Sequence, residues 1–186
     1  MDFVELTEKE YQKFWENHPL KTFLSAPKIA KLREKSNWKS YFVGVKENKK
    51  VVAAALLLSH KRKFNVNEFY SPRGFLLDYN NKELLTFFVE KVKEFAKSKN
   101  GYILRIDPYV IYKQRDINGD IVEGGEDNSH VVEHLTSLGF KKVKTENMEQ
   151  VGWMFSLGLE GKTEEQILKE MKPNTRNTIR KAEKLG

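Results

Sequence analysis

The sequence contains no cysteine among its 186 residues. Without a thiol, the chain forms no disulfide, no thiolate zinc site and no cysteine nucleophile. Its longest apolar run, 51–58, is far shorter than the roughly 20 residues that a transmembrane helix needs. The first 18 residues are polar and rich in acids, unlike a secretory signal. These absences predict a protein of the cytoplasm.

Hydrophobic residues make up 39% of the chain and charged residues 32%, a balance typical of a water-soluble globular protein. The net charge is +7. Residues 171–186 include five basic residues and one acid, so this short stretch carries +4 of the total. Such a concentration of positive charge suits a polyanion, such as nucleic acid, anionic lipid or a diphosphate. It is equally typical of a solvated helix face.

Apolar spacing and turn signals predict an alternation of strands and helices. The expected strands are 2–6, 41–46, 51–61, 64–70, 102–107, 140–144 and 150–159. The expected helices are 7–17, a segment that follows Ser25 with Pro27 near its first turn, 81–98, 128–138 and a C-terminal stretch broken near Pro173. Residues 47–50 read as a hairpin, and the apolar strand after them as a central one. This order predicts an α/β sheet covered by helices, similar to the order of the GNAT acyltransferase fold. The connection 108–127 is long enough to suggest a functional loop.

Four segments carry a specific pattern. They are Phe23–Arg33 followed by Trp38, Tyr70–Gly74 followed by Asp78, Leu104–Tyr109, and the ending Lys172–Ala182. In this order and at these distances, they resemble the FemA/FemX/MurM (FemAB) family of peptidoglycan bridge-forming enzymes. The resemblance covers essentially the whole chain.

The resemblance implies an α/β, GNAT-like (acyl-CoA N-acyltransferase-like) mixed sheet flanked by helices. It implies a GNAT-like lobe over 1–160 and a basic helical segment over 161–186 that leads to a second lobe not present in this chain. Such enzymes transfer an amino acid from aminoacyl-tRNA to a stem-peptide amine of a peptidoglycan precursor. They need no further cofactor, because aminoacyl-tRNA is the co-substrate. The implied partners are tRNA, a lipid-linked or UDP-linked precursor, and a membrane surface reached through a lipid-linked substrate.

Arg33 falls where the family usually places a lysine that binds the precursor's diphosphate. The exchange keeps the charge, and arginine can also grip a phosphate through two hydrogen bonds. Ser25 and Ala26 stand where Gln-Ser is usual, and Ile29 where Trp is common, which affects the expected substrate preference. The alternative for Arg33 is an arginine on a solvated helix surface.

Asp107 ends a predicted buried strand, and Pro108 prevents that strand from continuing inside the sheet. The implied chemistry is attack of an amine on an ester, and an amine with a pKa near 10.4, the lysine reference value, must first lose a proton. A carboxylate can orient this amine and stabilise the charge that develops on it. The structural alternative is an aspartate that caps the loop by pairing with Arg105 or a backbone amide.

Three further groups complete the candidate site. Arg73 precedes Gly74 in a turn, where it either contacts an anion or holds the turn through carbonyl groups. Tyr109 either lines a substrate-binding cleft at the end of the sheet or packs over that end as a structural residue. Arg176, Arg180 and Lys181 are the candidates for contacting nucleic acid.

No metal site is expected. His130 and His134 are four residues apart on one helix but lack a third ligand or an HExxH pattern.

Two other functions remain open. An acetyl-CoA N-acetyltransferase would need a Gln/Arg-x-x-Gly-x-Gly/Ala turn for the pyrophosphate, and the sequence has none. A non-catalytic RNA-binding module is compatible with the basic ending, although no known recognition motif is present.

Overall fold

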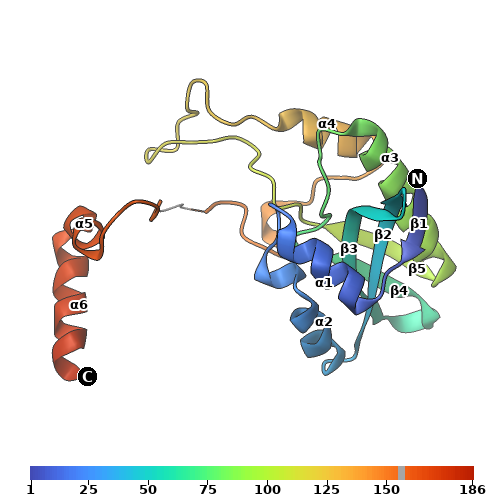
Figure 1. Cartoon of the computed structure of the whole chain (residues 1–186), viewed down its shortest axis with the longest axis horizontal. Helices are drawn as coiled ribbons and strands as arrows, with labels where there is room; N and C mark the ends of the chain where they lie inside the picture. The colour runs from blue at the N-terminus through green and yellow to red at the C-terminus, as the bar shows by residue number, and fades with distance from the viewer. Residues whose placement is uncertain (155–157) are drawn as a thin grey trace. The chain divides into compact units, whose positions relative to one another are not determined.

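The computed structural model describes residues 1–154 and 158–186, and the chain divides into two units, 1–150 and 151–186. The first unit is a sheet with helices on both faces (Figure 1). Its elements are β1 (Asp2–Glu5), α1 (Glu8–Asn17), η1 (Phe23–Ser25), α2 (Pro27–Glu34), β2 (Trp38–Glu47), β3 (Lys50–Lys61), η2 (Lys63–Asn65), β4 (Asn67–Ser71), α3 (Lys82–Ser98), β5 (Gly101–Ile106), α4 (Ser129–Ser137) and η3 (Thr145–Asn147). The second unit contains α5 (Glu164–Glu170) and α6 (Pro173–Leu185).

The five strands lie in the order β1-β2-β3-β4-β5. All neighbours are antiparallel except β4 and β5, which run parallel, so the sheet is mixed, as the sequence predicts. The hairpin predicted at 47–50 is confirmed: β2 turns into β3 through Asn48 and Lys49, which have φ values of 48° and 65°. Positive φ at two central residues matches the right-handed twist of the two strands.

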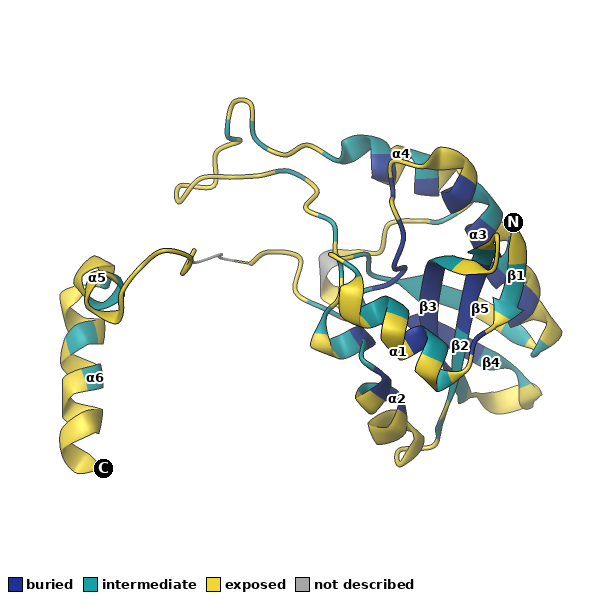
Figure 2. Ribbon diagram, viewed as in Figure 1, coloured by how far each residue is buried: buried dark blue, intermediate teal, exposed yellow. Residues whose placement is uncertain are grey.

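β3 is the central strand, apolar on both faces, as its sequence indicates. Ala53, Ala55 and Leu57 face the core beneath α3 and α4. The alternate residues Ala54, Leu56 and Leu58 face the core beneath α1 and α2. Burial is concentrated in this strand and in the faces of the helices that pack on it (Figure 2). Two cores therefore lie on opposite sides of one sheet.

Local signals set the helix ends. Thr7 caps α1: its hydroxyl accepts from the Glu10 amide at 3.2 Å, and the Glu10 carboxylate accepts from the Thr7 amide at 2.9 Å. This reciprocal pair is a capping box, which the spacing of Thr7 and Glu10 in the sequence favours. α4 ends before Gly139, whose φ of 87° favours glycine. The predicted 81–98 helix is confirmed as α3, with its spaced apolar residues buried.

Three strand predictions differ from the structure. β4 starts at Asn67 instead of residue 64, because Phe64 and Asn65 adopt the left-handed conformation that closes the hairpin. The strand predicted at 140–144 is irregular, because the Phe140 amide donates to the Leu135 carbonyl and its ring packs on the core, which ties the segment to the end of α4. The described residues of the 150–159 prediction form no strand, and 155–157 lie outside the described residues.

In the second unit, Thr163 caps α5 with Gln166, as the spacing predicts. The predicted break near Pro173 separates α5 from α6, and the Arg176 guanidinium donates to the Lys169 carbonyl at 2.9 Å. Across residues 1–154 and 158–186, no helix combines the length and the apolar character needed to cross a bilayer.

The packing predicts a large cost for truncating Phe88 on α3. Its ring is fully buried and meets Phe75 edge-on, with ring centroids 5.0 Å apart. We expect Phe88→Ala to lower the free energy of unfolding by about 3–5 kcal/mol, since an unfilled cavity adds to the lost burial. Phe23→Ala, at a ring that is 74% exposed, is the control and should change it by about 0.5 kcal/mol at most. Urea unfolding measures both, and equal effects would contradict this packing.

Candidate functional site

The parallel strands β4 and β5 bring two chain segments to the same edge of the sheet. Ser71 pairs with Ile106 at the last position of both strands. Beyond that pair, β4 continues into the turn at Pro72–Gly74, while β5 continues into Asp107 and Pro108. The carboxyl ends of neighbouring parallel strands commonly carry the polar groups of a site.

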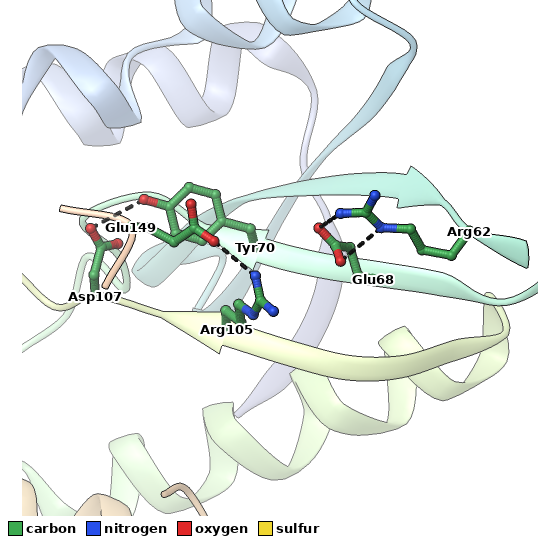
Figure 3. A network of polar contacts seen from close by, with 6 residues as sticks. All are labelled: Arg62, Glu68, Tyr70, Arg105, Asp107 and Glu149. Carbon is green, nitrogen blue, oxygen red and sulfur yellow. Dashed lines mark hydrogen bonds and ion pairs between the residues drawn. The ribbon is translucent and has the colours of Figure 1, made fainter. Parts of the chain in front are cut away.

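The Asp107 carboxylate joins these two segments. Its Oδ1 accepts a hydrogen bond from the Arg73 backbone amide at 2.7 Å, and its Oδ2 accepts one from the Tyr70 hydroxyl at 3.1 Å (Figure 3). Arg73 has a φ of 50°, in the left-handed region. The backbone in the turn therefore presents its N–H to the carboxylate.

Burial is the main cause of the pKa shifts of Asp107 and Tyr70. Desolvation raises the pKa of Asp107 above its ordinary value, although the Arg73 amide and the Tyr70 hydroxyl oppose the shift. Burial also raises the pKa of Tyr70, and the charge of Asp107 adds to that shift. The tyrosine therefore stays protonated at neutral pH and acts as the donor. The Asp107 backbone amide contributes a third contact, and a carboxylate has about four lone-pair sites, so the group can still accept another hydrogen bond.

Arg73 and Tyr109 lie beside this carboxylate. The Arg73 guanidinium carbon is 5.5 Å from the centroid of the Tyr109 ring, a cation–π contact, and Tyr109 is 41% exposed. The structure thus brings Asp107, Arg73 and Tyr109 together. The structural alternative for Asp107 is a loop cap formed with Arg105 or with a backbone amide. The carboxylate does accept a hydrogen bond from a backbone amide, that of Arg73, whereas Arg105 pairs with Glu149 at 2.8 Å. A loop-capping contact and a role in binding are compatible, because lone pairs remain available.

A row of polar side chains crosses the same face of β4 and β5 (Figure 3). Arg62 donates two hydrogen bonds to Glu68, at 2.9 and 2.8 Å, and Arg105 pairs with Glu149. Glu68 is buried, and the hydrogen bonds from Arg62 lower its pKa. The row extends along the strands toward Tyr70 and Asp107, so this part of the sheet has a polar face.

Arg33 lies in the last turn of α2 and is exposed. α2 packs on the same face of the sheet as Tyr70, since Ala30 and Tyr70 belong to one core. In the part of the chain that the structure describes, no hydrogen bond or ion pair joins Arg33 to Asp107. The two residues share a side of the sheet. The family resemblance predicts that both face one substrate cleft, and this stays a prediction.

The other predicted residues have simpler surroundings. Arg176, Arg180 and Lys181 lie on α6 in the second unit, and the first two are one helical turn apart. The imidazole of His130 bonds to Asn80, at 2.8 Å, and that of His134 to Thr86, at 3.0 Å. Among residues 1–154 and 158–186, no three His, Asp or Glu side chains gather in a way that could hold a metal ion.

Sequence reasoning missed Tyr70 as a member of the site. It is the first residue of the Tyr70–Gly74 motif, and its strand was expected to pair within the sheet. Its role depends on the register of β4 against β5, which sets Tyr70 opposite Arg105 and two residues from Asp107. That register is a property of the folded sheet, and the only signal in the sequence is a tyrosine at the start of the Tyr70–Gly74 motif.

Comparisons with known proteins agree with this architecture. The family model described as "FemAB family" matches residues 6–186. Aminoacyltransferase FemA of Staphylococcus epidermidis is 31% identical over 191 aligned residues, which cover 100% of this chain and 46% of that protein. FemA of Staphylococcus aureus (strain MW2) is 30% identical, with 100% of this chain and 45% of that protein covered. The chain belongs to the FemAB family.

The solved structure of FemX supports the fold. It superposes with a TM-score of 0.71 at 24% identity, over 97% of this chain and 43% of FemX. The predicted fold class, an α/β mixed sheet flanked by helices, is confirmed. The chain spans slightly less than half the length of the FemA proteins that it matches.

The raised pKa of Asp107 predicts a pH dependence of stability. Because its folded pKa lies above its unfolded value, the folded protein binds more protons between the two values, so this carboxyl lowers stability as pH rises through that window. The free energy of unfolding of Asp107→Asn, relative to wild type, should therefore increase from about pH 3 to about pH 7. Urea titrations along the pH range measure this difference.

Asp127 provides a control of opposite sign. Its pKa is lowered to about 2, by hydrogen bonds from Ser129 and by Lys113, so its contribution to stability is lost as pH falls toward 2. Asp127→Asn should lose stability relative to wild type as pH rises over the same range. A constant difference for Asp107→Asn would contradict the desolvation of its carboxyl.

Proposed function

We propose that this chain forms the first lobe of an aminoacyltransferase that acts in peptidoglycan biosynthesis. The lobe would take part in moving an amino acid from aminoacyl-tRNA to the stem-peptide amine of a cell-wall precursor. Membership of the FemAB family and the name of the FemA relatives support this proposal. The observation that carries it is the Asp107 carboxylate, held at the ends of β4 and β5 with lone pairs to spare.

The proposed reaction needs no cofactor, because the aminoacyl ester of tRNA is already activated. The amine nitrogen attacks the ester carbonyl, a C–N bond forms, and the C–O bond to the tRNA ribose breaks. The amine loses a proton, and the departing ribose oxygen gains one. In this scheme Asp107 accepts a hydrogen bond from the amine and stabilises the positive charge that develops on nitrogen. Tyr70 and the Arg73 amide hold the carboxylate in position for that contact.

Arg33 is proposed to bind the diphosphate of the precursor, whether lipid-linked or UDP-linked. It is exposed on α2, and its guanidinium can form two hydrogen bonds with a phosphate. Arg73 beside Tyr109 is proposed as a second substrate contact. On α6, Arg176, Arg180 and Lys181 are proposed to contact the tRNA backbone, where binding would weaken as salt is added.

Two substitutions in the full-length enzyme separate binding from chemistry. Arg33→Ala should raise the KM for the precursor roughly tenfold with little change in kcat, since it removes a charged contact made before and during reaction. Asp107→Asn should lower kcat by about a hundredfold, because charge stabilisation acts mainly in the transition state. Steady-state transfer assays with charged tRNA measure both constants.

Matched variants control for helix and fold effects. Lys28→Ala removes another exposed cation from α2 and should leave KM near wild type. Arg33→Lys should recover most of the affinity. An unchanged KM for Arg33→Ala would argue against the diphosphate contact, and an unchanged kcat for Asp107→Asn would argue against the role of this carboxylate.

Residues 1–186 alone should fold but transfer amino acids poorly. Positioning of two reactants contributes up to about 7–11 kcal/mol to catalysis, and it requires both to be held in an attacking geometry. We propose that the second lobe provides the remainder of that geometry. The test compares transfer rates for 1–186 and the two-lobe protein, with acetyl-CoA as a second donor. Rates within a few-fold of each other would show a complete enzyme, and transfer from acetyl-CoA would favour an N-acetyltransferase.

A further inference from the structure

The hairpin that joins β3 to β4 carries an exposed aromatic residue, Phe64, at its turn. Between Lys61 and Asn67 the chain turns back on itself, and the Arg62 amide donates to the Val66 carbonyl at 2.8 Å. At the turn, the Phe64 side chain is 95% exposed. We call residues 61–66 the basic tip. Its surface is exposed to solvent (Figure 2).

Folding alone does not account for Phe64. Its φ is 60°, a left-handed conformation that disfavours bulky side chains and is usually occupied by Gly, Asn or Asp. The ring also gains almost no burial in return. An apolar side chain at such a position is a local conflict that a binding role would explain.

The tip carries three consecutive cations, Lys61, Arg62 and Lys63. Arg62 is committed to the buried Glu68, through two hydrogen bonds. The two lysines, by contrast, take part in no ion pair within the described ranges 1–154 and 158–186. Positive charge at the tip is therefore available to an external anion.

Two further lysines come from neighbouring elements. Lys39 lies on β2, opposite Ser59, and Lys99 follows α3, where its carbonyl accepts from the Asn67 side chain at 2.6 Å. Their ammonium groups lie 5.1 and 5.8 Å from the centroid of the same ring, Tyr41. Neither forms an ion pair in the part of the chain that the structure describes. The end of the sheet that bears the tip thus gathers four lysines on three adjoining segments.

We propose that the basic tip docks this lobe on an anionic membrane surface. Phe64 enters the boundary between headgroups and acyl chains, where an apolar ring is favourable. Lys61 and Lys63 contact lipid phosphates while their methylene stems lie along the apolar boundary. Lys39 and Lys99 add to the attraction at longer range, and this part of it weakens with salt.

The shape of the tip favours a lipid surface over RNA. Proteins that bind single-stranded RNA stack several bases on aromatic rings along a groove or sheet surface. The tip offers one ring on a convex turn. The neighbouring ring of Tyr41 already lies beneath Lys39 and Lys99. A single protruding aromatic flanked by lysines matches the mixed apolar and anionic character of a membrane boundary.

Docking through the tip leaves the candidate site free. β4 begins next to the tip, at Asn67, and ends at Ser71, beside the turn that binds Asp107. The two features therefore lie at opposite ends of this strand. Membrane binding can be measured without any transfer assay and stands or falls independently of the proposed reaction.

Co-sedimentation of the chain with vesicles tests the proposal. One set of vesicles is phosphatidylcholine alone, and the other contains about 30% phosphatidylglycerol, which gives a negative surface. Wild type should bind the anionic vesicles selectively. Phe64→Ala should weaken this binding about tenfold, because burial of a phenyl ring in the membrane contributes about that factor to the affinity. The double variant Lys61→Gln/Lys63→Gln should weaken it about twentyfold.

Matched controls use residues of the same type elsewhere. Phe23→Ala removes another exposed ring, and Lys9→Gln/Lys13→Gln removes two exposed lysines of α1, so both should stay within about twofold of wild type. Phe64→Trp should keep the affinity and show a blue-shifted emission on anionic vesicles, relative to wild type. Circular dichroism verifies that each variant is folded.

An RNA arm separates the two kinds of polyanion. Single-stranded polyuridylate should bind wild type and Phe64→Ala equally, because the ring is assigned to lipid. Vesicle binding by Phe64→Ala equal to wild type would overturn the proposal. So would a loss on Phe64→Ala that appears with RNA and not with vesicles, which would assign the ring to base stacking.

Discussion

The hydrogen bonds to the Asp107 carboxylate hold the candidate site together. They link a side chain at the end of β5 to the tyrosine of β4 and to the backbone of the turn after β4. Without the parallel pairing of these strands, Asp107, Tyr70 and Arg73 would not meet. The desolvation that raises the pKa of the carboxyl is the energetic cost of this arrangement, and the two donors offset part of it.

One face of the sheet carries nearly all of the proposed chemistry. α2, which carries Arg33, packs on that face together with the buried ring of Tyr70. The polar row from Arg62 to Asp107 lies along the same face (Figure 3). The opposite face is closed by the apolar sides of α3 and α4. The strands also have two different ends: the basic tip lies at the start of β4, and Asp107 lies beyond its end. If both proposals hold, a membrane-docked lobe would present its carboxylate away from the lipid surface.

Local patterns predicted most of this fold. Capping pairs set the starts of α1 and α5, apolar spacing identified α3, and an uninterrupted apolar run marked β3 as central. Asp107 was accessible to sequence reasoning because a proline follows it and a known motif surrounds it. Tyr70 was not, since its contact depends on strand register, a non-local property. The strand predicted at 140–144 failed because the apolar alternation there is weak and the end of α4 holds Phe140 by a backbone hydrogen bond.

The central claim is that Asp107 receives the acceptor amine at the shared end of β4 and β5. A crystal structure of the proposed two-lobe enzyme with a peptidoglycan precursor bound would test it directly. The account predicts the stem-peptide amine at about 3 Å from an Asp107 carboxylate oxygen, with the Tyr70 and Arg73 hydrogen bonds intact. An acceptor amine bound away from this carboxylate, with Asp107 contacting only Tyr70 and Arg73, would contradict it and leave the residue a purely structural role.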